Sequence, residues 1–337
     1  MSTALPVRPT YIALAILLAG LAIRAPFLNA LTSDTELYVL AWYEHIAASG
    51  LQALGENIPN RLGELTANYT PPYFYLLYLV SRLDGILPSL WLIKAISIAF
   101  DCLGAFFAYK IVRLHFSRER ALIVGACVFL APTVIANGAW WGQCDMIWAS
   151  LLLGSLYFIL ARKPVLGLFF FGLAVAFKAQ AIFFSPFLLM LLLRGEIRWW
   201  HLAIPALVYI TLMVPAVMFG QTWEQVLTVY LQQASHFQFL SLSAPNLYYF
   251  APESLYTIGV AVGLSVTVIV SAALAYLPRH TKAPMDDATR VLSAAMFVAL
   301  SVFLLPKMHD RYFFGADVFT ILLAGFIPRL WIVAATF

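Results

Sequence analysis

Long apolar stretches separated by short polar connections dominate this chain, in the pattern of helices that cross a membrane many times. A spanning helix needs about twenty mainly apolar residues, and ten stretches meet or approach that length. We expect spans over residues 11–28, 90–112, 119–137, 146–161, 164–177, 181–193, 199–219, 255–277, 290–305 and 312–327. The pattern therefore predicts an all-α polytopic membrane protein, with residues 1–337 forming a single transmembrane domain.

Two longer polar segments, residues 29–89 and 221–254, interrupt the apolar pattern. The first carries only Arg61 against five acids before its Pro-Pro pair, so the positive-inside rule places it on the non-cytoplasmic face. Residues 73–87 within it are too short to cross, and the basic end of the next span should be cytoplasmic. We therefore expect an interfacial or re-entrant outer helix there, with its tyrosines at the headgroup level.

The composition excludes a soluble domain, since 63% of the 337 residues are hydrophobic, 11% are charged and the mean hydropathy is +0.87. The net charge of +4 comes from Lys and Arg scattered over short loops, which indicates membrane anchoring and no nucleic-acid partner. Arg24 interrupts the end of the first apolar run, so we expect a retained helix and no cleaved signal peptide.

The three cysteines are too few, and too apolar in their surroundings, for a disulfide framework or a metal cluster. We expect three free thiols. Cys144 is expected near the outer surface, with Cys102 and Cys127 inside the bilayer.

Polar residues that break the apolar pattern fall on connections predicted to face outside. Polar groups are costly near hydrocarbon and usually point into a bundle interior or a wet cavity, so this asymmetry indicates an active site at the outer membrane boundary. The candidates are Asp34 and Glu36, then Trp141, Gln143 and Asp145, then Lys178 and Gln180, Asn246, and finally Lys307, His309 and Arg311.

Each candidate also has a structural interpretation. Asp34 could cap the helix that follows it, Trp141 could belong to an aromatic belt, and Lys178 could snorkel to the interface. Lys94 could contact substrate, or it could neutralise Asp101, which lies seven positions further on the same helix face.

Carboxylates facing basic groups suit group transfer from a lipid-linked anionic donor. Asp34 could take the proton of an acceptor hydroxyl, while Lys178, His309 and Arg311 stabilise the leaving phosphate. Direct displacement by the acceptor predicts inversion at the anomeric carbon. A divalent ion on Asp34 and Glu36 is conceivable, but the nearby cationic side chains make it unnecessary.

The ordered set of motifs resembles the GT-C glycosyltransferases that use polyprenyl-phosphate sugars. Within that superfamily it is similar to bacterial relatives of the GPI mannosyltransferases and of the dolichyl-phosphate-glucose-dependent glucosyltransferases of the N-glycan pathway. The motifs are Asp34, Tyr69-Thr70-Pro71-Pro72, Trp141-Gly142-Gln143-Cys144-Asp145, Lys178-Ala179-Gln180 with Pro186, Asn246, and His309-Asp310-Arg311 in place of His-Glu-Lys. The chain departs from the larger members by having fewer helices, and from the motifs by its Asp-x-Glu pair and by Arg311 where they have lysine.

The resemblance implies a GT-C-like bundle whose first outer loop forms juxtamembrane helices, with Asp34 as catalytic base and no metal. Lys178, His309 and Arg311 would approach the donor phosphate. The substrate-binding set would be Glu36, Lys94, Trp141, Gln143, Asp145, Gln180 and Asn246. We expect a hexose, mannose- or glucose-like, to pass from a polyprenyl-phosphate sugar to a glycan, lipid or protein hydroxyl at the outer face of a bacterial inner membrane.

Two other functions are compatible with the sequence. A transporter or flippase for a lipid-linked or anionic solute would explain Asp101 inside a span, although internal repeats and midplane sites are typical of transporters and no repeat is visible. A glycan polymerase or ligase would differ in using a polyprenyl-diphosphate oligosaccharide as donor.

Overall fold

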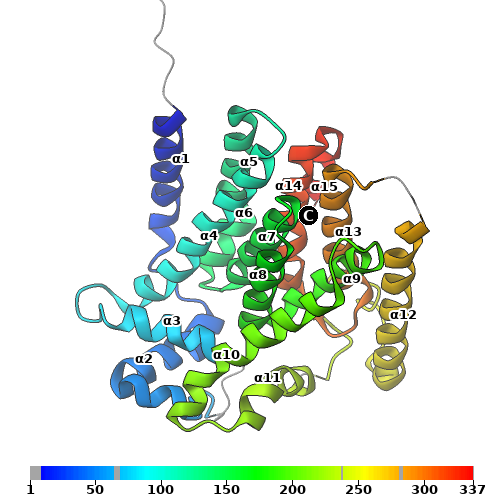
Figure 1. Ribbon diagram of the computed structural model, residues 1–337. Helices are drawn as coiled ribbons and strands as arrows, with labels where there is room; N and C mark the ends of the chain where they lie inside the picture. The colour runs from blue at the N-terminus through cyan, green and yellow to red at the C-terminus, as the bar shows by residue number, and fades with distance from the viewer. Residues whose placement is uncertain (1–8, 64–68, 237, 281–283, 337) are drawn as a thin grey trace, which may run out of the picture.

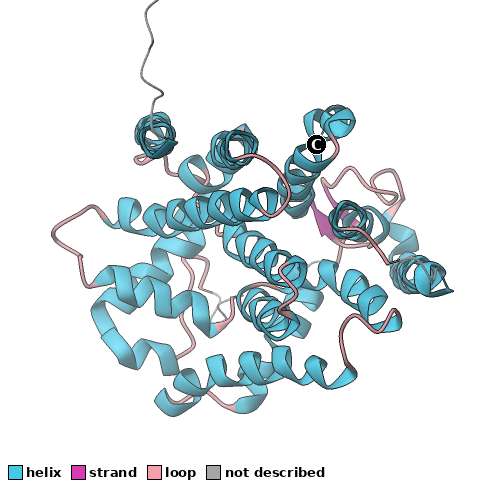
Figure 2. Cartoon of the chain, turned by 45° about the horizontal axis from the view of Figure 1, so that its top comes forward, coloured by secondary structure: helices cyan, strands magenta, loops and turns pink. Residues whose placement is uncertain are grey.

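The structure, a computed structural model, describes residues 9–63, 69–236, 238–280 and 284–336. It is a helical bundle in which α7 and α8 lie in the middle, while α1 and α12 stand at opposite edges (Figure 1). The helices are α1 (Pro9–Arg24), α2 (Leu40–Ser49), α3 (Pro71–Ser81), α4 (Ser89–Arg113), α5 (Arg118–Leu130), α6 (Pro132–Ile135), α7 (Asp145–Leu160), α8 (Pro164–Phe177), α9 (Ser185–Leu193), α10 (Ala203–Phe219), α11 (Trp223–His236), α12 (Tyr256–Tyr276), α13 (Asp287–Leu304), α14 (Phe314–Phe326) and α15 (Trp331–Thr336). Two short strands, β1 (Ser241–Leu242) and β2 (Met308–His309), pair in parallel and appear in magenta in Figure 2.

The helices confirm the predicted class of polytopic membrane protein. Among the described residues, five helical stretches are long and apolar enough to cross a membrane, and α5 with α6, bent by 44°, makes a possible sixth. The three apolar stretches that contain α7, α8 and α9 are shorter. A helix lies in each of the ten stretches expected from the sequence, but the count of ten spans stays a prediction.

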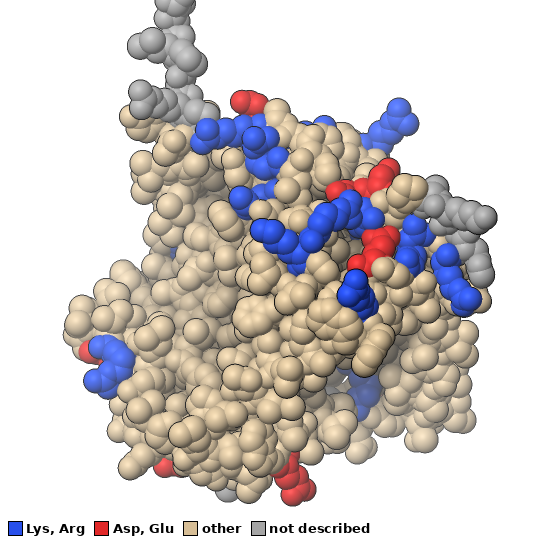
Figure 3. Space-filling view, in the orientation of Figure 1, with Lys and Arg blue, Asp and Glu red and all other residues tan. Residues whose placement is uncertain are grey.

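Basic side chains gather towards the end of the molecule where α1 begins (Figure 3). Ion pairs occur among the connections on that side, where the Asp287 carboxylate accepts from Arg162 at 3.1 Å and from His115 at 3.0 Å. The positive-inside rule predicted this concentration of Lys and Arg for the cytoplasmic side.

Helix α7 is apolar on all sides because it is surrounded by other helices. Fourteen of its sixteen residues are buried, so it has no polar face to present to water or headgroups. Gly154 lets the ring of Phe170 in α8 approach, since a Cβ at Gly154 would lie 2.5 Å from that ring. The centre of the bundle therefore fixes the position of Asp145, the first residue of α7.

Helix α3 occupies the outer segment that was predicted to be interfacial, and two of its tyrosines, Tyr73 and Tyr75, pack against the protein. Tyr73 is buried, and the Tyr75 hydroxyl donates to Leu212 O at 2.9 Å and accepts from Ala216 N at 3.1 Å. Pro215 lies inside α10 next to these backbone groups, and a proline there disturbs the helical ladder. The Tyr75 hydroxyl thus bridges the carbonyl of Leu212 and the N–H of Ala216, and this contact packs α3 against α10.

An ion pair inside the bundle joins α1 to α4. Arg24 donates to Asp101 Oδ2 from Nη2 at 2.8 Å and from Nε at 3.1 Å, and both side chains are almost fully buried. Arg24 also donates to Gly20 O and Phe129 O, which links the pair to α5. The predicted neutralisation of Asp101 by Lys94 is therefore wrong, because residues on different helices supply the pairing.

The second outer segment, expected as a loop over 221–254, contains the amphipathic helix α11 and the strand β1. Tyr230 of α11 donates its hydroxyl proton to Val175 O near the end of α8. Strand β1 pairs with β2, placing Ser241 opposite Met308 and Leu242 opposite His309. This segment thus supports two of the connections that carry candidate site residues.

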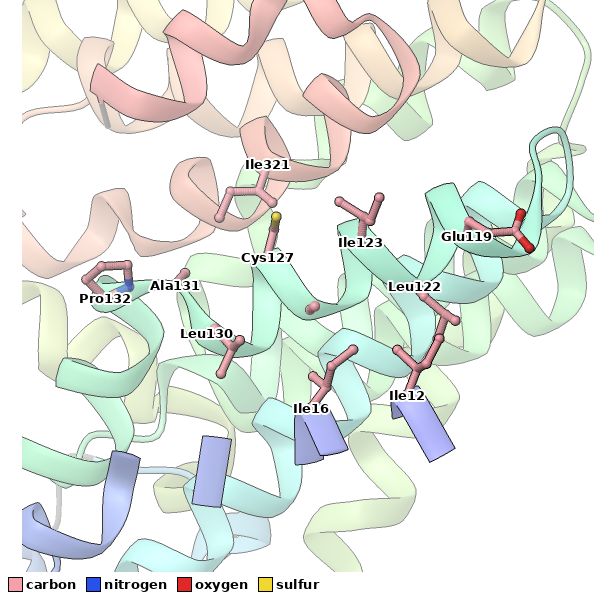
Figure 4. A pocket seen from close by; sticks show the side chains of 11 residues that line it. Ile12, Ile16, Glu119, Leu122, Ile123, Cys127, Leu130, Ala131, Pro132 and Ile321 are labelled. Carbon is pink, nitrogen blue, oxygen red and sulfur yellow. The ribbon is translucent and has the colours of Figure 1, made fainter. Parts of the chain in front are cut away.

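An apolar groove of about 730 Å³ runs between α1, α5 and α14 (Figure 4). Ile12 and Ile16 form one wall, Cys127 lies along the base, and Glu119 stands at one end. The lining suits lipid chains and carries no cluster of polar groups. The exposed thiol of Cys127 therefore faces this apolar groove.

We predict that Arg24→Met destabilises the protein strongly, by about 3–5 kcal/mol, because it leaves the Asp101 carboxylate buried without its cation. The double variant Arg24→Met with Asp101→Leu should recover much of that loss, since it removes both charges. Thermal unfolding in detergent of the two single variants and the double variant measures this coupling. Losses that simply add in the double variant would show that the pair contributes no such coupling.

Candidate active site

Asp34 is held at the start of a short π-helix, Thr35–Val39. A second π-helix, Ala136–Trp140, lies just before Trp141. Thr32 donates its hydroxyl proton to Trp141 O at 3.0 Å, and Thr35 also donates to that carbonyl. Single π-helical turns are frequent at functional sites. The two turns are thereby fastened together, and they bring Asp34 beside the connection that carries Gln143.

The Asp34 carboxylate has two side-chain partners from distant parts of the chain. Arg311 donates to Asp34 Oδ2 from Nη1 at 2.8 Å, and Gln143 donates to the same oxygen from Nε2 at 3.1 Å. The Tyr69 hydroxyl lies 3.5 Å from Gln143 Oε1. Asp34 remains about one third exposed, so a substrate can reach it.

A second acid, Asp145, is completely buried and fully supplied with donors. Lys178 pairs with Oδ1, Trp148 Nε1 donates to the same oxygen at 3.2 Å, and Asn137 Nδ2 donates to Oδ2 at 2.9 Å. Lys178 itself follows the end of α8 in extended backbone and is 6% exposed. Lys178 therefore has a carboxylate partner, although that partner is far from it in the sequence.

The Thr70-Pro71-Pro72 motif positions this lysine. Thr70 is buried, and its hydroxyl lies 2.6 Å from Ala176 O and 3.2 Å from Phe177 O, the last carbonyls before Lys178. Pro71 and Pro72 then begin α3, where proline is well tolerated because the first N–H groups of a helix have no partner within it. The motif thus ties the first outer segment to the end of α8.

Arg311 connects the two acids electrostatically. Burial alone would lower the pKa of Arg311, but the nearby carboxylates of Asp145 and Asp34 help to raise it above its ordinary value. Burial raises the pKa of Tyr69 well above its usual range, so its hydroxyl keeps its proton. The site is an alternating arrangement of carboxylate and cation in the order Asp34, Arg311, Asp145, Lys178.

His309 lies at the edge of this arrangement and is held by β2. Its Nδ1 contacts the Asp310 carboxylate, which also accepts from Arg311 N at 2.6 Å. Burial, together with Arg311, lowers the pKa of His309. The lowered pKa favours the neutral imidazole, and the expected contact of His309 with the donor phosphate stays a prediction.

Two residues expected to bind substrate, Glu36 and Lys94, contact other groups. Glu36 lies 3.4 Å from Arg61, which also contacts Glu44 at 3.0 Å, so the two acids of the Asp-x-Glu pair face different arginines. Lys94 is fully buried and donates to Phe27 O and Ala30 O at 2.6 Å each, and to Trp140 O at 3.3 Å. Lys94 fastens the end of α1 to the second π-helix and does not line the site.

Asn246 and Gln180 also differ from expectation. Asn246 donates to Leu305 O at 3.1 Å and accepts from Tyr248 N at 3.0 Å, so it braces the α13–α14 connection. Gln180 lines a separate cavity of about 630 Å³ together with Lys307 and has a buried Oε1 without a hydrogen-bond partner among the described residues. Neither touches the four-residue arrangement.

Cys144, expected near the outer surface, is buried beside Tyr69, so its thiol is not open to an impermeant reagent. Asn137, Trp148 and Asp317 are site or cavity residues that the sequence did not reveal, because they lie inside apolar runs. Among the described residues, no three His, Cys, Asp or Glu side chains are grouped as metal ligands.

A cavity of about 640 Å³ adjoins the arrangement, which we call the Trp140 cavity. Arg311 belongs to both the arrangement and the cavity wall, and Asn137, which donates to Asp145, also lines the cavity. Its wall includes Asn137, Trp140, Trp141, Asp310, Arg311 and Asp317. The segment 307–312 separates this cavity from the one lined by Gln180.

No family model matches the sequence, and no curated protein matches it significantly. Two solved structures are similar over almost the whole chain: ArnT from Cupriavidus metallidurans bound to undecaprenyl phosphate and the same protein in the apo state. They match 98% and 97% of this chain with TM-scores of 0.63 and 0.65, at 16% and 17% identity.

The chain has the fold of ArnT. This confirms the GT-C-like bundle predicted from the ordered motifs. The chain spans 62% of the length of each ArnT structure, so the likeness concerns the bundle and its outer connections.

We predict that Gly142→Ala disturbs the junction of the two π-helices. Gly142 has φ +75°, and a Cβ there would lie 2.7 Å from Thr35 Oγ1, so the substitution adds the loss of a buried hydrogen bond to backbone strain. Backbone strain costs about 1–2 kcal/mol and the lost hydrogen bond about 1 kcal/mol more. Gly85→Ala is the matched control, because Gly85 has φ +80° and no atom within 4 Å of its Cβ position.

Thermal unfolding of the two variants in detergent separates the effects. Gly142→Ala should unfold at a lower temperature than Gly85→Ala. Equal losses would mean that the Thr35 contact contributes nothing.

Proposed function

We propose that this protein is an inverting membrane glycosyltransferase that moves a hexose from a polyprenyl-phosphate sugar to a hydroxyl acceptor. The observation that carries the proposal is the 2.8 Å pair between Asp34, a partly exposed carboxylate, and Arg311, a guanidinium suited to phosphate. The ArnT fold supports a polyprenyl lipid as substrate, since one of the two similar structures contains undecaprenyl phosphate. The concentration of basic residues at the opposite end favours a site on the non-cytoplasmic face, and we expect a bacterial inner membrane.

In the proposed reaction the acceptor oxygen attacks the anomeric carbon while the bond from that carbon to the phosphate oxygen breaks. The acceptor proton passes to Asp34, and the bonding electron pair leaves with the phosphate. Arg311 stabilises the charge that develops on the phosphate, while His309 lies at the edge of the site with its one ring N–H donated to Asp310. A single displacement inverts the anomeric configuration.

Asp145 and Lys178 have a supporting role in this proposal. Lys178 keeps the buried Asp145 carboxylate neutralised, and the charge of Asp145 in turn favours the cationic form of Arg311. Asp34 and Glu36 face separate arginines and so do not form the carboxylate pair that a divalent ion needs. The proposed reaction therefore relies on cationic side chains.

The transporter alternative loses its main support. Asp101 favoured a transport function because it lies inside a span, but its carboxylate is fixed by two hydrogen bonds from Arg24. The ion pair with Arg24 accounts for Asp101, and no transported solute is needed to explain it.

We predict that Asp34→Asn abolishes transfer, because asparagine keeps the shape and the hydrogen bonds of the side chain but cannot accept the proton. The loss should be roughly 10²–10⁴-fold. The measurement is mass analysis of glycans and glycolipids in a strain lacking the gene, complemented with wild type or with the variant.

Glu44→Gln is the control, since Glu44 is exposed and contacts only Arg61 among the groups described above. It should restore the glycan to the wild-type level. Restoration by Asp34→Asn at that same level, with both proteins equally abundant in the membrane, would remove Asp34 from the mechanism.

A further inference from the structure

The Trp140 cavity contains polar atoms whose hydrogen-bonding capacity is unused. Asn137 Oδ1, Asp317 Oδ1 and Arg311 Nε are buried and have no hydrogen-bond partner among the described residues. Asp317 is 8% exposed and Asn137 is 5% exposed. A buried polar group without a partner is destabilising, so three such atoms on residues that line one cavity indicate that something else supplies their partners.

The charges on the cavity wall exclude most classes of ligand. Asp310 and Asp317 disfavour an anion inside the cavity, and Arg311 disfavours a cation. The unused atoms are two acceptors and one donor, which matches neutral hydroxyl groups because a hydroxyl both donates and accepts. Trp140 and Trp141 add large apolar faces beside them. A cavity with mostly apolar walls and a few convergent polar groups is the usual form of a small-molecule site.

The place of Arg311 identifies which hydroxyl compound fits. Its Nη1 is bonded to Asp34, while the residue also lines the cavity and its Nε is unpaired. A phosphate bound by the Arg311 guanidinium would place the group that is bonded to that phosphate inside the cavity. The group attached to the phosphate of the proposed donor is a sugar ring.

We propose that the Trp140 cavity binds the sugar ring of the lipid-linked donor, with Asp317 as the residue that selects it by accepting hydrogen bonds from ring hydroxyls. This inference rests on the proposed function and adds to it the subsite and the selecting residue. The terminal torsion of an aspartate side chain is broad, so either carboxylate oxygen can turn toward a hydroxyl. A site built to bond a hydroxyl rejects an analogue that lacks it far more strongly than an apolar pocket does.

Asp317 also lies in the first turn of α14, where an acid favours the helix N-terminus, so a purely structural role must be separated from selection. Glu224, in the first turn of α11, is the matched acid outside the cavity, and Glu224→Gln serves as control. Asp317→Leu removes the acceptor. Asp317→Asn keeps one acceptor oxygen and a similar shape, and it covers the case in which the leucine variant does not fold.

The experiment measures competition against radiolabelled undecaprenyl phosphate in detergent-solubilised protein. The competitors are unlabelled undecaprenyl phosphate, the same lipid carrying mannose or glucose, and monodeoxy analogues of each sugar. Wild type and Glu224→Gln should bind one sugar-bearing lipid at least tenfold more tightly than one of its deoxy analogues. Asp317→Leu should lose that preference and keep its affinity for the sugar-free lipid within twofold, and Asp317→Asn should lose part of it.

Weaker binding of every lipid by the Asp317 variants in equal measure would assign Asp317 a structural role and overturn the inference. An unchanged preference between sugar and deoxy sugar in a folded Asp317 variant would also overturn it. Failure of the wild type to bind undecaprenyl phosphate at all would instead count against the proposed function, on which the subsite depends.

Discussion

The site depends on the cost of placing a guanidinium where water is largely excluded. Arg311 is paired there with Asp34, the charge of Asp145 favours its cationic form, and Lys178 balances that second acid. Desolvated charges are stable only when they are paired and hydrogen-bonded. Asp34 lies in the first outer segment, Asp145 at the start of α7, Lys178 between α8 and α9, and Arg311 between α13 and α14. The charges can therefore be balanced only when these four segments converge.

Local backbone features make that convergence possible. The two π-helical turns, the left-handed Gly142 and the proline pair after Thr70 each direct a side chain or a carbonyl toward the same point. None of them carries reactive chemistry. They hold the reactive side chains on rigid elements, and such support keeps a site within the few tenths of an ångström that group transfer demands.

The sequence predicted the membrane class and named Asp34, Lys178 and Arg311 as candidates, because polar residues at the ends of apolar runs are visible in one dimension. It did not predict the pairings. Asp34 and Arg311 are 277 positions apart, and only the packing of the bundle brings them together. Asp101 was assigned to Lys94 since helical periodicity detects neighbours on one helix, whereas its partner Arg24 is on another.

The resting structure also constrains how the proposed base becomes active. The Asp34 carboxylate accepts a hydrogen bond from the Arg311 guanidinium, so it meets an acceptor hydroxyl more freely when another anion takes up part of that guanidinium. A donor phosphate is such an anion, and the guanidinium fork has donors beyond the one bonded to Asp34. In the proposed reaction, donor binding would therefore loosen the contact between Arg311 and Asp34 at the moment when a sugar is in place. The same pair would then link the availability of Asp34 to occupancy of the donor site.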